Sequence, residues 1–158
     1  MLRLIDDAVL DEVSAEAAAS PRRRKNYNYH RPEEGVQRML NAIEPDTYIR
    51  PHKHEAPDKV EVFLCLRGRA AVLAFDDEGR VQQATVIAPG GPAHGAEVPP
   101  RTWHALLSLE PGTVVYEVKD GPYDPATDKH FAPWAPAEGA PEVAQYLERL
   151  RGRVKSEA

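Results

Sequence analysis

The chain has 158 residues, a length that suits one domain with a single hydrophobic core. Hydrophobic residues make up 42% of it and charged residues 28%, which is typical of a globular protein and excludes a disordered one. The formal net charge of -5 argues against electrostatic binding to nucleic acid or to an anionic membrane surface. Cys65 is the only cysteine, so no disulfide can form within the chain.

The N-terminal region is expected to form an amphipathic helix rather than a targeting segment. Asp6 is a suitable N-cap, and Pro21 ends the helical pattern of residues 5–19. The apolar positions that recur at helical spacing are Val9, Leu10, Val13 and Ala17. Acidic residues interrupt the apolar stretch that a signal peptide needs, and no run approaches membrane-spanning length, so we expect a cytoplasmic protein with no membrane partner.

Residues 25–43 contain one extended segment and one ambiguous segment. In KNYNYH, residues 25–30, polar and aromatic side chains alternate as in an extended chain. In VQRMLNAI, residues 36–43, the apolar positions match a helical stripe, but eight residues before a Glu-Pro-Asp turn fit a strand equally well. These residues by themselves leave the choice open.

From residue 47 onward the pattern is that of a β-protein, with short apolar or alternating runs separated by turns that contain Gly and Pro. The expected strands cover residues 48–53, 60–66, 69–75, 81–87, 97–98, 103–109 and 113–119. Several short strands of this kind predict a β-sandwich or barrel.

The segment after the last expected strand is rich in Pro and aromatic residues, so we expect it to wrap the barrel. Pro141 then opens an amphipathic C-terminal helix. The prediction is a mainly β, single domain over residues 1–158. It is divided into an N-terminal helix (1–21), a β-barrel (22–119), an irregular wrapping segment (120–140) and a C-terminal helix (141–152).

Two histidines and a glutamate lie at the ends of expected strands. Strand side chains alternate, so His52 and His54 point to the same side, and a reversal at Pro57 brings Glu61 to face them. His104 follows a Pro-Pro turn and also lies at a strand end. Imidazole nitrogens and a carboxylate oxygen that converge in this way bind a divalent transition metal. The four residues are therefore the candidate metal ligands.

This pattern resembles the first motif of the cupin superfamily, a small double-stranded β-helix barrel, of the RmlC-like jelly-roll type, with a metal in its lumen. His52, His54, Glu61 and Gly68 match the motif. The chain departs from it at the leading glycine, where Asp46 stands, and in a longer gap before the glutamate.

The second cupin motif is matched by Pro99 and His104, while Arg101 and Ser108 replace its usual glycine and asparagine. These departures leave the ligand set intact.

The stretches VQRMLNAIEPDTYIRPHKH, FDDEGRV and EVKDGPYDPATDKHFAPWAP are similar to the WbuC-like cupin-fold metalloproteins over about residues 22–137. This resemblance implies a bacterial metal-binding cupin, and some members of that group are encoded among surface-polysaccharide genes. It also favours a strand for residues 36–43.

Several further residues are candidates for the wall of a substrate pocket. Tyr48 and Arg50 share the parity of the histidine pair, and an inward arginine would suit an anionic substrate such as a carboxylate or a sugar phosphate. Glu117 and Lys119 alternate on the last expected strand and could reach the same pocket. The residues expected to stay outside the metal site are His30, His94, His130 and Cys65, the cysteine as a small core residue.

The leading functional hypothesis is a metal-dependent enzyme acting on a small polar or sugar-derived molecule. Iron would permit oxygenase-type chemistry, whereas zinc, nickel or manganese would favour isomerisation or hydrolysis; imidazole and carboxylate ligands accept all four. The alternative is a non-catalytic module that binds or senses a small molecule with the help of the metal. The strand at 60–66 is apolar on both faces, which predicts cover by a second sheet layer, by the terminal helices or by the partner in a homodimer.

Overall fold

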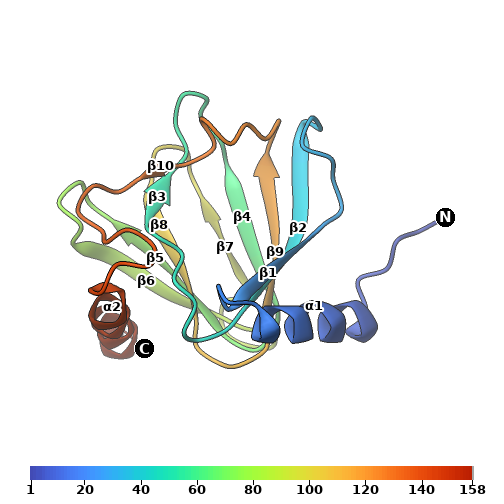
Figure 1. Ribbon diagram of the computed structural model, residues 1–158, viewed down its shortest axis with the longest axis horizontal. Helices are drawn as coiled ribbons and strands as arrows, with labels where there is room; N and C mark the ends of the chain where they lie inside the picture. Colours follow the sequence, from blue (N-terminus) through green and yellow to red (C-terminus); the bar gives the residue numbers. More distant parts are fainter. Residues whose placement is uncertain (158) are drawn as a thin grey trace.

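Two antiparallel five-stranded sheets face each other in the computed structural model, which describes residues 1–157 (Figure 1). The first sheet has the order β1 (Arg24–Asn28), β2 (Val36–Ile43), β9 (Thr113–Asp120), β4 (Glu61–Arg67), β7 (Gly95–Val98). The second has the order β10 (His130–Phe131), β3 (His52–Lys53), β8 (Trp103–Ser108), β5 (Ala70–Phe75), β6 (Val81–Ile87). This arrangement confirms the expected mainly β fold of the cupin jelly-roll type.

The ambiguous segment at residues 36–43 is a strand. β2 pairs with β1 on one side and with β9 on the other, so it is an inner strand of the first sheet. Leu40 and Ala42 pack beneath a helix on the outer face, while Ile43 belongs to the core between the sheets. Since both faces of the strand are covered, its sequence lacks the simple alternation of a half-exposed strand.

A helix covers the outer face of each sheet (Figure 1). In α1 (Asp7–Ala19), the Asp6 side chain accepts a hydrogen bond of 3.2 Å from the Val9 amide, as expected of an N-cap. In α2 (Val143–Glu157), which begins two residues later than expected, Leu147 and Leu150 pack on the second sheet. Neither helix, over the described residues, has the length and apolar character needed to cross a membrane.

The space between the sheets changes from apolar to polar along the strands. The inward side chains at the apolar level include Ile43, Phe63, Leu106 and Val115. The inward side chains two residues away on the same four strands are polar. They are Asn41, Glu61 and His104, two residues earlier in the sequence, and Glu117, two residues later. Because every second residue of a strand faces the same side, these polar groups share the inner faces of the sheets with the apolar core and lie beside it.

The segment between β9 and α2 bridges the two sheets. It leaves the first sheet, where the Gly121 amide donates to the Gly35 carbonyl at 2.9 Å. It then crosses to the second sheet, where β10 pairs with β3 (Figure 1). The Pro-rich stretch thus contacts both sheets, and it contains the short strand β10, which was not expected.

Glu138 fastens the end of this segment to β1. Its carboxylate accepts hydrogen bonds from Arg22 at 2.8 and 2.9 Å and from Arg24 at 3.0 and 2.9 Å. The hydrogen bonds from Arg22, followed by those from Arg24, lower the pKa of Glu138 to about 2 and outweigh the opposite effect of burial.

We expect Glu138→Gln to lower the melting temperature slightly at neutral pH. The folded-state pKa lies below the ordinary 4.5, so the carboxylate stabilises the fold above that value, and its contribution disappears as the pH falls towards about 2. Since the side chain is 42% exposed, solvent screening limits the contribution to about 1 kcal/mol or less.

Melting curves at pH 7 and pH 3 check this expectation, with Glu142→Gln as a control for loss of an exposed helix-end carboxylate. A difference between wild type and Glu138→Gln that grows on acidification would contradict it.

The outer face of β4 is only partly covered. Leu66 packs against the cluster beneath α1, whereas Leu64 is 43% exposed and Val62 is half-buried. The helix therefore covers one end of the doubly apolar strand and leaves the other end open.

Candidate metal centre

The four candidate ligands lie together in the polar level between the sheets. His52 on β3 is directly paired with His104 on β8, His54 follows β3, and Glu61 is the first residue of β4 in the facing sheet. One nitrogen from each histidine and one carboxylate oxygen all lie within 4.8 Å of one another, and all four side chains are buried. Such a group could hold a metal ion.

Backbone carbonyls orient the three imidazole rings. Each Nδ1 atom faces a carbonyl oxygen, and these belong to Arg50 for His52, Thr102 for His104 and Asp128 for His54. The first two distances are both 2.9 Å. A carbonyl can only accept, so each Nδ1 carries the proton and donates it, and the Nε2 atom presents its lone pair to the centre of the cluster.

These lone pairs have no protein donor to satisfy them. The Nε2 atoms of His52, His54 and His104 and the Oε2 atom of Glu61 are buried and find no hydrogen-bonding geometry among the described residues. Yet Glu61 Oε2 lies only 2.8 Å from the His104 nitrogen and 3.3 Å from the His54 nitrogen. Acceptors this close repel one another unless a cation lies between them, so the donor set fits a divalent metal ion.

The charge states of the ligands suit metal binding. Burial lowers the pKa of His52 well below its ordinary value, the positive charge of Lys129 adds to this effect, and the ring stays neutral. Burial alone would raise the pKa of Glu61, but hydrogen bonds that His104 and His54 donate to it whenever they are protonated hold the pKa well below its ordinary range, so the carboxylate is ionised. Neutral imidazole and ionised carboxylate are the forms that coordinate a metal.

Metal affinity should fall as the medium is acidified below about pH 6.5, where unperturbed imidazole takes up a proton. Protons and metal compete for the same Nε2 lone pairs, so each protonated ring removes a ligand. Titrations with a chromophoric competitor between pH 8 and pH 5 measure this dependence. An affinity that stays constant over that range contradicts coordination by histidine.

A cavity of about 850 Å³ opens above the cluster. Three of the four expected pocket residues, Arg50, Glu117 and Lys119, line it together with His52, His104 and Glu61, and the β1–β2 wall adds asparagine and glutamine side chains. Its volume lies within the range of small-molecule sites, about 300–1,000 Å³.

Tyr48 lies outside this cavity, contrary to expectation. Its ring is buried between the second sheet and α2, edge-on to Tyr146 at a centroid distance of 6.0 Å. Its hydroxyl donates to the Pro136 carbonyl at 2.8 Å. Residues 47–51 precede β3 and are not strand, so the alternation that placed Tyr48 beside Arg50 does not apply there.

Glu117 lies beside the metal cluster. The Asn41 side-chain amide donates to it, and Lys119 Nζ lies 3.7 Å from its other oxygen. Burial, and next the neighbouring Glu61 carboxylate, raise the pKa of Glu117 well above its ordinary range. A divalent cation held by Glu61 would reduce that repulsion and favour the ionised form of Glu117.

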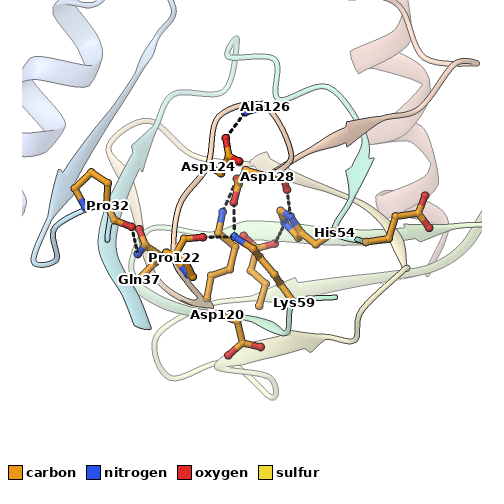
Figure 2. Close-up of polar contacts among 12 residues, drawn as sticks. Pro32, Gln37, His54, Lys59, Asp120, Pro122, Asp124, Ala126 and Asp128 are labelled. Atoms are coloured by element: carbon orange, nitrogen blue, oxygen red, sulfur yellow. Dashed lines mark hydrogen bonds and ion pairs between the residues drawn. The ribbon is translucent and has the colours of Figure 1, made fainter. Parts of the chain in front are cut away.

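Two buried lysines and an aspartate form a network that the sequence did not reveal (Figure 2). Lys59 Nζ donates to Asp128 at 3.1 Å and to the Pro122 carbonyl at 2.8 Å, and Lys119 Nζ donates to the other Asp128 oxygen at 2.9 Å. The carbonyl of the same Asp128 accepts from His54. Asp128 thus ties the bridging segment to a candidate metal ligand.

The remaining histidines and Cys65 lie apart from the cluster, as expected. His30 accepts a hydrogen bond of 2.8 Å from the Arg38 amide at the cavity wall, and His130 lies 2.7 Å from the Glu55 carbonyl. Cys65 is buried in the core between the sheets.

Two facing jelly-roll sheets that enclose a His-His-Glu-His cluster define a cupin-fold protein with a candidate metal site. The chain belongs to the family described as "Domain of unknown function (DUF6016)", whose model matches residues 5–87. The matched region contains His52, His54 and Glu61 and ends before His104. No curated protein sequence matches the chain.

Solved structures with a similar fold share little sequence with it. CapF, solved with the inhibitor 3-isopropenyl-tropolone, has a TM-score of 0.54 and 19% identity over 68% of this chain and 30% of its own. TT1209 from Thermus thermophilus has a TM-score of 0.53 and 17% identity over 75% of this chain and 97% of its own. KdgF from Halomonas sp. has a TM-score of 0.51 and 17% identity over 66% of this chain and 84% of its own. At these identities the likeness establishes the fold.

Proposed function

We propose that this protein is a metal-dependent enzyme that acts on a small polar or sugar-derived molecule and holds one divalent transition metal per chain. The observation that carries the proposal is that the unsatisfied lone pairs of the cluster lie at a cavity of about 850 Å³. Four protein ligands would close a tetrahedral structural site, whereas a five- or six-coordinate metal held by the same four residues keeps one or two positions open towards the cavity.

When bound, the metal would supply Lewis-acid polarisation and a fixed point for orienting the substrate. The residues that would hold it are His52, His54, Glu61 and His104. Glu117 lies next to Glu61 in the cavity wall, where its carboxyl group can hold or accept a proton close to a ligand bound at the metal. The resemblance to the WbuC-like cupin metalloproteins favours a sugar-derived substrate and a place in surface-polysaccharide biosynthesis.

One observation favours a non-catalytic binding or sensing module instead. Of the buried carboxylates that line the cavity in the described part of the chain, Asp128 is held by two lysines and Glu61 belongs to the metal cluster, which leaves Glu117 as the remaining carboxyl group for proton transfer. Binding would need no such group, whereas proton-transfer chemistry would rely on this single residue.

Elemental analysis of protein purified without chelators or an immobilised-metal column tests the metal. Close to one equivalent per chain is expected, and less than about a tenth after reconstitution would contradict the proposal. Cobalt-substituted protein tests whether a coordination position is open. Azide should bind to the cobalt ion at that position and change the visible absorption spectrum. Turnover of candidate sugar derivatives by the loaded protein then separates an enzyme from a module that shows saturable binding without product.

We also propose that the open end of the β4 outer face, around Leu64, associates with a second copy of the chain. An exposed leucine beside half-buried Val62 forms an apolar area that a partner would cover. Light scattering at micromolar concentration should give a dimer mass, and Leu64→Lys should give the monomer. A monomeric wild type would refute the proposal.

A further inference from the structure

We infer that the cavity binds its ligand as an oxyanion, with a carboxylate or phosphate group held by Arg50 beside the candidate metal centre. This inference rests on the proposed function, since it assigns the chemical class of the molecule that the same site would take. It is carried by the hydrogen-bonding state of Arg50, by the balance of buried charges and by the polarity of the cavity wall.

The Arg50 guanidinium is held in place but incompletely satisfied. One terminal nitrogen donates to the Ala132 carbonyl at 2.8 Å, and the group lies over the Phe131 ring at 5.4 Å. The Nε atom is buried and has no hydrogen-bond partner in the described part of the chain. The ion pairs found among those residues include none to Arg50, although its side chain lines the cavity.

Arg50 differs in this respect from the other arginines that line the cavity. Arg22 and Arg24 both donate to Glu138, so each already has a carboxylate partner. Arg50 also adjoins the metal cluster, because His52 donates to its backbone carbonyl and the His52 ring lies 6.2 Å from Phe131. An anion bound by the guanidinium would thus lie on the same wall as a candidate metal ligand.

Once a metal is present, the positive charges at the site outnumber the negative ones. Lys59, Lys119 and Arg50 bring three positive charges, which the three nearby carboxyl groups match only when all of them are ionised. The carboxylates available for this balance are Glu61, Glu117 and Asp128. A divalent ion adds two positive charges while its imidazole ligands add none, and uncompensated charge in a buried site is costly. An anionic ligand restores the balance.

Lys129 adds a further positive charge at the exposed edge of the cavity, and its field contributes to the low pKa of His52. The opposite wall, formed by β1 and β2, contains Arg24 and Lys25 and also four amide side chains. These are Asn26, Asn28, Gln37 and Asn41. Amide side chains both donate and accept, which suits hydroxyl groups. The ligand class that matches both walls is a small hydroxylated oxyanion.

Calorimetry on the metal-loaded protein tests this inference with three matched probes: gluconate for a carboxylate, glucose 6-phosphate for a phosphate and glucose for a neutral sugar. At least one anion should bind more tightly than glucose. Arg50→Gln should lower the affinity for that anion by about 10- to 100-fold, which is the usual effect of losing a hydrogen bond to a charged group. Arg50→Lys should restore only part of that affinity.

Arg101→Gln is the control, because Arg101 pairs with Asp58 on the surface and does not line the cavity; it should leave anion affinity unchanged. The metal content and the melting temperature of each Arg50 variant are measured as well. They show whether a variant has lost only the anion site or has also lost the metal or the fold. The inference is wrong if glucose and both anions bind with equal affinity, or if neither anion binds at millimolar concentration. It is also wrong if a folded, metal-loaded Arg50→Gln variant keeps the full affinity for the anion. Failure of the wild type to take up metal would instead refute the proposed function.

Discussion

Replacing His52 or His104 by alanine is expected to abolish tight metal binding and to leave a cooperatively folded protein. Each substitution removes a buried Nε2 ligand that no other described residue within the cluster can replace. Glu61→Gln should weaken metal binding less than the loss of a histidine, because an amide oxygen can still coordinate without the charge. Elemental analysis and competition titrations measure the loss.

The fold should survive these substitutions because its cores do not depend on the metal. One apolar cluster lies between the sheets, a second lies beneath α2 and a third beneath α1. Small metal-dependent domains lack such cores, so their metal-binding energy is their folding energy. Here the metal adds only a linkage contribution of about 3–4 kcal/mol when its free concentration exceeds the Kd by 100- to 1,000-fold.

The melting temperature of the holo protein should therefore fall by roughly 10 °C in these variants, since 1 kcal/mol corresponds to about 2–4 °C for a chain of this size. His94→Ala is the matched control, because His94 is exposed and lies outside the cluster. Circular dichroism at 25 °C is the decisive measurement. If either variant is unfolded there, the metal is structural and the argument for an open site falls with it.

The second large effect is expected from Asp128→Ala. The substitution leaves Lys59 and Lys119, which are 2% and 5% exposed, without their shared carboxylate. Breaking a buried ion pair from one side costs about 3–5 kcal/mol because a charge remains buried without compensation. The free energy of unfolding measured by denaturant titration should fall by that amount.

Asp128→Ala should also weaken metal binding by about 10- to 100-fold, because the carbonyl that orients His54 belongs to the segment that the carboxylate anchors. Asp58→Ala is the control, since it removes an exposed partner of Arg101 and should change neither quantity measurably. Unchanged stability in Asp128→Ala would show that the two lysines find other partners. Unchanged metal affinity in a destabilised variant would show that His54 is held without this segment.

The candidate metal cluster could be predicted from the sequence because its members stand at strand ends with the required parity. His52 and His54 are separated by one residue, Glu61 is the first residue of its strand and His104 the second of its own, so period-two alternation suffices to aim them inward. The same alternation brought Glu117 and Lys119 to the cavity. It was wrong for Tyr48, where the chain is not a strand.

The contacts of the bridging segment could not be predicted from the sequence, for a physical reason. Asp128 lies in an irregular stretch in which no periodicity relates residue number to direction, so nothing local predicts that its carboxylate meets Lys59 and its carbonyl meets His54. These contacts are set by how the segment crosses between the sheets. The β2 segment was ambiguous for a related reason, because cover on both faces removes the alternation that distinguishes strand from helix.

The distribution of the ligands over both sheets has a consequence for the order of folding. His52 and Glu61 belong to different sheets, His104 arrives on a later strand, and the His54–Asp128 contact spans 74 residues of sequence. Contacts between residues so distant in the chain pay a large loop-closure entropy before they form, which delays them relative to local pairings. Absorption by a cobalt ion during refolding would therefore appear only after the two sheets have met, and it would report the last stage of assembly rather than the first.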